Sequence, residues 1–227
     1  MKNIVVLTGA GISAESGLKT FRDENGLWEG HDIYEVASPQ GFEQNPTLVL
    51  DFYNQRRRQL LEVKPNAAHL ALQQLEEKYN VHTITQNVDD LHERAGSKNV
   101  IHLHGELLKA RSTANENSVI DWKEDIMLGD LCANQHQLRP HIVWFGEAVP
   151  MLPIAAEIVE KADILLIIGT SMQVYPAAGL VDFASRQCQI YFIDPKPAMQ
   201  SNHQVKVIAE KATIGVPALV EELLSHE

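Results

Sequence analysis

The sequence has few of the features that mark a secreted or membrane-bound protein. Its 227 residues include only two cysteines, Cys132 and Cys188, and no Cys-x-x-Cys pair. A disulfide framework is therefore not expected, and a reduced, cytoplasmic setting is the default. The apolar run at residues 4–7 is too short for a signal-peptide core, and no run approaches the roughly twenty apolar residues of a membrane helix. We expect a soluble intracellular protein that does not enter a membrane.

Basic residues are also scarce. Lys and Arg number 19 against 30 Asp and Glu, which gives a net charge of -11. A nucleic-acid binder needs a basic face to neutralise phosphates, so nucleic acid is not an expected partner. Hydrophobic residues make up 44% of the chain, enough for a sizeable core in one domain that carries an insertion. We expect a monomer.

Short apolar runs alternate with helical patterns along the chain. Runs typical of buried parallel strands occupy residues 4–7, 81–85, 164–168 and 190–193. Helical patterns between them include residues 67–79 and 154–162. This alternation predicts an α/β fold with a doubly wound parallel sheet. Because ligands bind beyond the carboxyl ends of such strands, we expect the polar segments after the four runs to meet in one crevice.

The first of these runs leads into a glycine turn. Gly9, Ala10, Gly11 and Ser13 belong to the sequence GAGISA, which fits the pattern G-x-G-x-x-G/A. Small residues let the backbone approach a pyrophosphate, and the following helix begins with its positive end toward that charge. Taken alone, the pattern also fits a plain tight turn. The acidic residue that a dehydrogenase carries about 20 positions later is not evident.

Two stretches interrupt the alternation and predict a smaller inserted lobe. A helix should begin at Pro46, with Asn45 as its N-cap. The polar sequence STANENS indicates a loop. We predict a Rossmann-like domain over residues 1–30, 63–106 and 142–227, with the small lobe over residues 31–62 and 107–141.

Five sequence blocks carry a family resemblance. In chain order they are GAGISAESGLKTFRDENGLW, TQNVDDLHERAG, HLHGEL, HIVWFGE and GTSMQVYPAAGL. Together they resemble the sirtuins, the NAD-dependent protein-lysine deacylases. The resemblance implies that NAD is the cofactor and that acylated lysine-containing proteins or peptides are the substrates. It also implies that nicotinamide and O-acyl-ADP-ribose are released.

The resemblance assigns residues to the cofactor. The polar segment after the glycine turn corresponds to the loop that closes over NAD, with Phe21 beside the nicotinamide ribose and Arg22 and Asp23 fixing the loop and cofactor. Later segments would serve the adenosine half: Gly169, Thr170, Ser171, Asp194 and Ala212. Asp194 departs from the family, which commonly has Asn there.

The candidate catalytic residues lie within the second and third blocks. Asn87 and Asp89 would orient the nicotinamide carboxamide and the ribose, and Gln86 would hydrogen-bond to the ribose. An imidazole titrates near neutral pH, so His104 is our candidate general base for a ribose hydroxyl. His102 is its rival because residues two apart share one face of an extended segment. The family motif favours His104.

The segments at residues 145–147 and 174–175 would hold the substrate. By resemblance they sandwich a peptide as an added strand, so binding would depend on backbone hydrogen bonds. Val143 and the adjoining aromatic residues would form an apolar tunnel for the lysine stem, or are simply core. The predicted substrate residues are Val143, Phe145, Gly146, Glu147, Val174 and Tyr175.

The helix expected from Pro46 carries residues that would determine which acyl group is removed. Tyr53 and Arg56 lie three apart and share a helix face, whereas the arginines that follow point elsewhere. A hydroxyl with a guanidinium suits a carboxylate, and in sirtuins this Tyr-x-x-Arg resembles the class that removes succinyl and malonyl groups. Ala37 would keep the pocket wide, so deacetylation remains possible. Without the family context, the same residues describe a solvated helix face.

A structural zinc site is not expected. Most sirtuins have two cysteine pairs in the small lobe, but this chain has Ser112 and Thr113 at the first pair and only Cys132 at the second. A tetrahedral site needs about four Cys or His ligands. The lobe should then depend on loop hydrogen bonds and on packing of Trp122, Ile126, Met127 and Leu131.

Three other functions remain as alternatives. A mono-ADP-ribosyltransferase would transfer label from NAD to protein, whereas a deacylase would release it as free acyl-ADP-ribose. A non-catalytic NAD-sensing module is disfavoured by the intact His104 and Asn87. A dehydrogenase would produce NADH and no nicotinamide, and the chain lacks a convincing hydride site.

Overall fold

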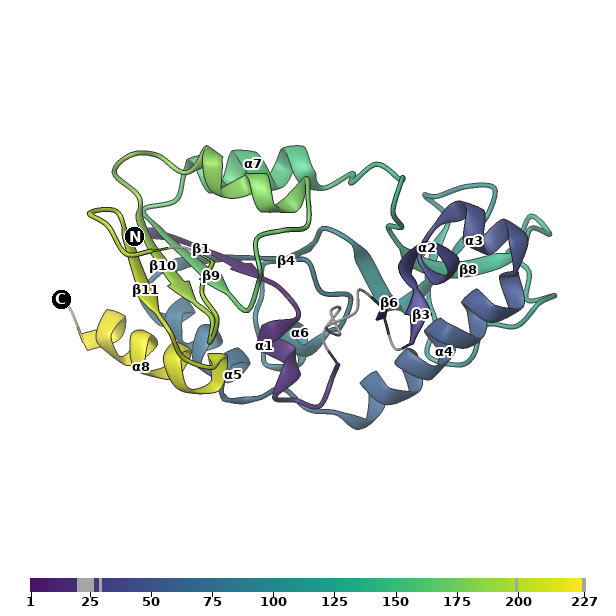
Figure 1. The fold of residues 1–227 in the computed structure, drawn as a ribbon, viewed down its shortest axis with the longest axis horizontal. Coiled ribbons are helices and arrows are strands. Elements are labelled where there is room, and N and C mark those ends of the chain that lie inside the picture. Colours follow the sequence, from purple (N-terminus) through teal and green to yellow (C-terminus); the bar gives the residue numbers. More distant parts are fainter. Residues whose placement is uncertain (20–26, 29, 199, 226–227) are drawn as a thin grey trace.

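The chain forms two unequal lobes side by side, as Figure 1 shows. The computed structural model describes residues 1–19, 27–28, 30–198 and 200–225. Both termini belong to the larger lobe, which is built on a parallel sheet (Figure 1). No helix within these ranges is long and apolar enough to cross a membrane.

The larger lobe confirms the predicted α/β fold. Its sheet has the strand order β11-β10-β9-β1-β4-β5, and all of its pairings are parallel. The strands are β1 (Asn3–Thr8), β4 (Asn80–Thr85), β5 (Val100–His102), β9 (Ile164–Ile168), β10 (Gln189–Ile193) and β11 (Val205–Ile208). The four predicted runs match β1, β4, β9 and β10. The two edge strands, β5 and β11, are partly exposed and lack a continuous apolar run, so the pattern did not reveal them.

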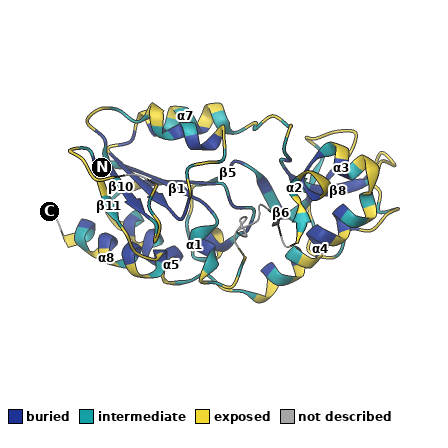
Figure 2. Ribbon diagram, in the orientation of Figure 1, coloured by how far each residue is buried: buried dark blue, intermediate teal, exposed yellow. Residues whose placement is uncertain are grey.

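Alternating residues of β1 face two separate helical layers. Ile4 and Val6 pack toward α5 and α8, whereas Val5 and Leu7 pack toward α7 and the 3-10 helix η2. Figure 1 shows α7 on one side of the sheet and α5 with α8 on the other, and the strands between them are largely buried (Figure 2). These elements are α5 (Ala67–Gln74), η1 (Leu75–Glu77), α7 (Leu152–Glu160), η2 (Ala177–Phe183) and α8 (Ala212–Ser225).

The smaller lobe combines short helices with an antiparallel sheet of order β7-β6-β8. Helix α4 begins at Pro46 as predicted, and the Leu48 amide donates to the Asn45 side chain at 3.1 Å. The sheet reaches slightly beyond the predicted lobe of residues 107–141, because β6 begins at Gly105. The elements are β2 (Leu27–Trp28), β3 (His31–Asp32), α2 (Ile33–Val36), α3 (Pro39–Gln44), α4 (Pro46–Glu62), β6 (Gly105–Ser112), β7 (Val119–Asp121) and β8 (Leu138–Ile142).

The strand order creates a crevice between β1 and β9. The chain leaves β1 toward β4 on one side and leaves β9 toward β10 on the other, so their carboxyl ends form a topological switch point. Ligands of doubly wound sheets bind at such a point. The short helices α1 (Gly11–Ala14) and α6 (Leu91–Arg94) lie at this end of the sheet, between it and the smaller lobe (Figure 1).

Candidate active site

Two glycine turns meet at the switch point. The Gly9 amide donates to the Ile168 carbonyl at 3.0 Å, and the Gly11 amide donates to the Gly169 carbonyl at 2.8 Å. A Cβ on Gly11 would lie 2.6 Å from the Gly169 Cα, and Gly169 itself has a φ of +61°. Only glycine fits this approach of two backbones. The turns after β1 and β9 therefore form one rigid floor.

A buried polar chain lies beside the first turn. The Asn87 side-chain amide donates to the Gly9 carbonyl at 3.2 Å and to the Ser13 hydroxyl at 3.1 Å. The Ser13 hydroxyl in turn donates to the Asp89 carboxylate at 2.9 Å. Burial raises the pKa of Asp89, while the hydrogen bond from Ser13 opposes that shift. The segment after β4 is thus joined to the segment after β1.

His104 occupies the bend after β5, with one ring nitrogen already used. Its Nδ1 lies 3.0 Å from the Gln86 carbonyl, which accepts only, so Nδ1 carries the hydrogen. Nε2 therefore holds the lone pair, and among the described residues no side chain or main-chain group bonds it. Burial lowers the pKa of His104, against the opposing effect of the Gln86 hydrogen bond. The ring is accordingly neutral near pH 7 and able to accept a proton at Nε2.

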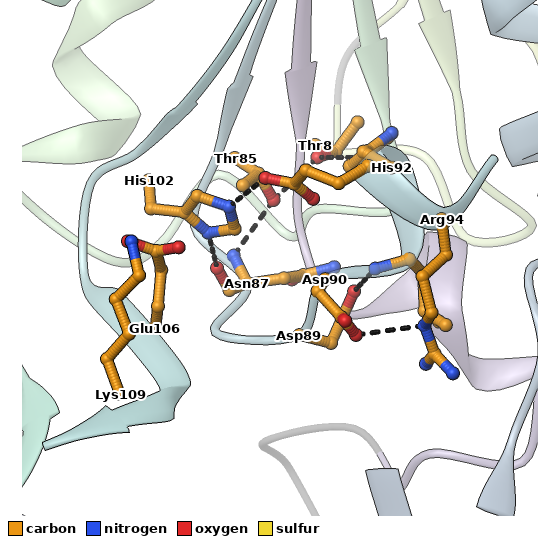
Figure 3. A network of polar contacts seen from close by, with 12 residues as sticks. Thr8, Thr85, Asn87, Asp89, Asp90, His92, Arg94, His102, Glu106 and Lys109 are labelled. Atoms are coloured by element: carbon orange, nitrogen blue, oxygen red, sulfur yellow. Dashed lines mark hydrogen bonds and ion pairs between the residues drawn. The ribbon is translucent and has the colours of Figure 1, made fainter. Parts of the chain in front are cut away.

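His102 has a different environment, although it lies only two residues away. Its Nε2 is 2.7 Å from the Glu93 carboxylate and its Nδ1 is 3.0 Å from the Asn87 main-chain carbonyl. The ring does not border the cavity that His104 faces. Figure 3 shows His102 between the Asn87 segment and the side chains of β6. Both nitrogens are engaged, so His102 is not available as the general base.

One cavity of about 670 Å³ joins these segments. Its size is typical of small-molecule sites. On the switch-point side, Gln86 donates to the Thr170 hydroxyl at 3.3 Å, and burial raises the pKa of Asp194. Every predicted cofactor residue within the described ranges borders the cavity: Gly9, Ala10, Gly11, Ser13, Gln86, Asn87, Asp89, Gly169, Thr170, Ser171, Asp194 and Ala212. Phe21, Arg22 and Asp23 lie outside the described residues.

The opposite end of the cavity is aromatic. The Trp144 indole donates to the Tyr53 hydroxyl oxygen at 3.0 Å, and burial raises the pKa of Tyr53 far above its usual range. Arg56 stacks 3.4 Å from the Phe52 ring centroid and donates to the Phe52 carbonyl. The predicted substrate residues all border the cavity: Ala37, Tyr53, Arg56, Val143, Phe145, Gly146, Glu147, Val174 and Tyr175.

Several cavity residues were absent from the sequence prediction. Leu60 could have been found, because it lies four residues after Arg56 on the same face of α4. The others come from loops and strands whose position depends on long-range packing. They include Leu18, Leu107 and Ile142.

Comparison with known proteins identifies the family. The Sir2 family matches residues 9–176, about three quarters of the chain. This protein belongs to the Sir2 family. An NAD-dependent protein deacylase of Helicobacter pylori (strain ATCC 700392 / 26695) is 60% identical over 225 residues, which cover 99% of this chain and 98% of the relative. One from Bacteroides thetaiotaomicron is 51% identical over 231 residues, with 99% of each chain covered.

Solved structures agree. A Sir2 homologue in complex with NAD has a TM-score of 0.86 and 39% identity, covering 98% of this chain and 90% of that one. A Sir2 protein bound to an acetylated peptide has a TM-score of 0.80 and 30% identity, covering 96% and 92%. The first of these complexes contains NAD and the second an acetylated peptide.

In this Sir2 family member, Glu147 is the centre of an ion-pair cluster that the sequence did not predict. Arg139 donates to its carboxylate at 2.7 and 3.1 Å, and Arg111 at 3.0 and 3.1 Å. The Trp144 amide adds a fifth bond at 2.8 Å. Burial raises the pKa of Glu147, but the hydrogen bonds and the two positive charges outweigh it and leave the pKa below its usual value. Arg139 also lies 3.2 Å from the Trp144 ring centroid, so the cluster braces the aromatic wall.

The small lobe of this Sir2 family member packs differently from our expectation. Ile126 is fully buried and Trp122 partly buried, but Met127 and Leu131 are 59% and 45% exposed, so their predicted packing role is wrong. Their loop instead turns those side chains outward and hydrogen-bonds through Asn54, which accepts from the Ile126 amide at 2.8 Å and donates to the Ile126 carbonyl at 3.0 Å.

In the region where most sirtuins have the two cysteine pairs, this chain has a cysteine and a serine in contact. The Cys132 Sγ lies 3.4 Å from the Ser112 hydroxyl, and both residues are buried. Within the described ranges, no group of three or more His, Cys, Asp or Glu side chains is arranged to hold a metal ion. Nearby, fully buried Arg57 donates to the Leu107 carbonyl at 3.0 Å, and burial lowers its pKa to about 10.

Proposed function

We propose that this protein is an NAD-dependent protein-lysine deacylase that releases nicotinamide and O-acyl-ADP-ribose. Its relatives at 51% and 60% identity are named NAD-dependent protein deacylases. The observation that carries the proposal is the position of His104. Its ring borders a single cavity that has paired glycine turns at one end and an aromatic wall at the other.

The residues at the switch point fit NAD. The joined turns at Gly9 and Gly169 leave no Cβ between the backbone and a pyrophosphate, which is the requirement of a dinucleotide site. Asn87 and Asp89 would hold the nicotinamide half, and Asp194 with Ala212 the adenosine half. When bound, NAD supplies an electrophilic ribose carbon. The protein contributes orientation, a dry aromatic wall and a base.

His104 is the proposed base. With Nδ1 anchored to the Gln86 carbonyl, the ring presents the Nε2 lone pair toward the cavity. Since burial lowers its pKa, the ring is unprotonated at neutral pH and can take a ribose hydroxyl proton, then return it. Activity should therefore be lost as the pH falls through the His104 pKa.

We also propose selectivity for succinyl and malonyl over acetyl groups. An indole N–H can only donate, so the Tyr53 oxygen accepts from Trp144 and the Tyr53 hydrogen must point elsewhere. Tyr53 is thereby set as a donor, beside the Arg56 guanidinium. A donor hydroxyl and a fixed positive charge are complementary to a carboxylate at the far end of an acyl chain. The cavity is wide enough for acetyl-lysine to be accepted as well.

The test is incubation with NAD and acetyl-, malonyl- and succinyl-lysine peptides, with products read by mass spectrometry. We expect His104→Ala to abolish deacylation while NAD binding stays measurable. His203→Ala, at an exposed histidine, is the matched control and should keep wild-type turnover. Full turnover by His104→Ala would overturn the mechanism. Label from NAD that ends on protein would indicate mono-ADP-ribosyl transfer instead.

We further propose that the protein acts as a cytoplasmic monomer on acylated proteins or peptides. Both cysteines are buried and free, which suits a reduced compartment. A peptide laid between the segments at Gly146 and Val174 would need only one copy of this chain, since both segments border the same cavity.

A further inference from the structure

His102 hydrogen-bonds through both ring nitrogens to groups that can only accept. Nε2 lies 2.7 Å from a Glu93 carboxylate oxygen. Nδ1 lies 3.0 Å from the Asn87 main-chain carbonyl (Figure 3). A neutral imidazole has one N–H and can satisfy only one such acceptor. The contacts therefore describe an imidazolium paired with a carboxylate, in a side chain that is 8% exposed.

The groups around His102 reinforce this charge state. Burial alone lowers its pKa, but the hydrogen bond and charge of Glu93, followed by the Asn87 carbonyl and the charge of Glu106, leave the pKa raised. The other charged groups facing it are Asp89, whose carboxylate interacts favourably with it, and Lys109, which is paired with Glu106 at 2.8 Å. His92 faces it from α6, and burial lowers the pKa of His92 well below its usual value.

The Asn87 carbonyl belongs to a segment, residues 85–88, in which every main-chain carbonyl accepts a hydrogen bond. After β4, the carbonyls of residues 85 and 88 accept from the main-chain amides of Leu103 and Leu107, each within 2.9 Å. The two carbonyls between them accept from side chains instead, Gln86 from His104 and Asn87 from His102. His102 and His104 thus hydrogen-bond to adjacent main-chain carbonyls of one segment.

Holding this segment determines where the proposed catalytic groups point. The Asn87 side chain reaches the glycine turn at Gly9, while its main chain is tied to His102. We propose that His102, kept as an imidazolium by Glu93, is a positioning residue that fixes Asn87 and the adjoining His104 anchor for the NAD-dependent reaction. This inference rests on the proposed function, because it assumes that Asn87 and His104 act on the cofactor.

The opposite charge states of His102 and His104 give the activity a pH dependence that packing alone would not produce. His104 must be neutral to accept a proton, so the acid limb of activity belongs to its pKa. A deprotonated His102 has one N–H for two acceptors and can no longer hold the Asn87 carbonyl and the Glu93 carboxylate together, so we assign the alkaline limb to its pKa. Two histidines two residues apart therefore bound the active range from opposite sides.

The experiment compares Glu93→Gln with Glu106→Gln, which removes a carboxylate near His102 that does not hydrogen-bond it. The kcat and KM for an acyl-lysine peptide are measured from pH 6 to 10, with ring NMR shifts of His102 recorded over the same range. Glu93→Gln should move the alkaline limb and the His102 titration down together by about one pH unit or more, because an adjacent opposite charge shifts a pKa by that amount. At pH values above both limbs, this corresponds to an about tenfold lower kcat in Glu93→Gln than in the wild type.

Glu106→Gln should move the alkaline limb and the His102 titration by much less than Glu93→Gln does. Neither variant should move the acid limb. A His102→Leu variant should lose kcat at every pH, and His102→Gln, which can still donate to the Asn87 carbonyl, should recover part of it. An alkaline limb that stays in place in Glu93→Gln, or a His102 ring that is neutral at pH 7 in the wild type, would overturn the positioning role. A wild-type protein without deacylase activity would overturn the proposed function instead, and the NMR titration would still report the charge of His102.

Discussion

Acid pH should destabilise this protein through a pair of buried histidines beneath the glycine turn. His69 on α5 and His92 on α6 are both fully buried, with ring centroids 4.9 Å apart. The Thr8 hydroxyl donates to Thr85 at 2.8 Å, so Thr8 accepts from His92 Nε2 at 3.1 Å. His92 Nδ1 is buried with no hydrogen-bond partner among the described residues, and burial lowers the pKa of both rings. The pair is therefore folded in the neutral form.

The size of the effect follows from the difference between folded and unfolded chains. Burial lowers the pKa of His69 from 6.5 to about 4. Between those values the unfolded chain binds a proton that the folded chain does not, so stability is complete above pH 6.5 and falls as the pH drops toward 4. Each pKa unit corresponds to about 1.4 kcal/mol, so His69 alone should lower the free energy of unfolding by about 2 kcal/mol between pH 7.5 and 5.

The assay is urea unfolding of the wild type, His69→Phe and His203→Gln at pH 7.5 and pH 5. Phe keeps the ring contact with His92 but cannot titrate, so its loss of stability on acidification should be smaller than that of the wild type by about 2 kcal/mol. The exposed His203 is the control, and its variant should follow the wild type. An equal acid loss in His69→Phe and wild type would refute the assignment, whatever their stabilities at pH 7.5.

Three further outcomes follow from the site. Arg56→Met should lower succinyl-lysine turnover far more than acetyl-lysine turnover in parallel peptide assays, and equal losses would contradict the assigned carboxylate contact. Glu147→Gln should lower the free energy of unfolding by about 3–5 kcal/mol, because Arg111 and Arg139, at 8% and 9% side-chain exposure, would lose their counter-ion; a loss under about 1 kcal/mol in urea unfolding would argue against the cluster. Metal analysis of the purified protein should find no stoichiometric zinc, and one zinc per chain would reverse that expectation.

The limits of sequence reasoning are clearest at the paired histidines. Period-two alternation puts His102 and His104 on the same face of an extended segment, and so treats them as equals. In the structure the strand ends at His102, and the chain bends at residues 103 and 104 before β6 begins at Gly105. That bend sends one ring into the cavity and the other toward Glu93. A pattern of local periodicity contains no information about which of two rings a distant carboxylate will meet.

The ion-pair cluster at Glu147 shows the same limit. Arg111 lies 36 residues from Glu147 in sequence, and no motif connects them. The exposure of Met127 could not be predicted from the sequence either, because an apolar residue in a loop belongs to no periodic pattern that would assign it to a face. Both depend on how β6, β7 and β8 pair, which is a non-local property.

The order of amino acids was enough to predict the α/β class, the central strands, the start of α4 and the residues that gather at the switch point. These depend on local rules: apolar runs bury themselves, Asn-Pro begins a helix, and parallel strands present their carboxyl ends together. The charge and role of each histidine, the bracing of the aromatic wall and the exposed side of the small lobe could be read only from the folded chain. Those features arise from burial and from partners far apart in the chain, and their energies exist only after the chain has folded.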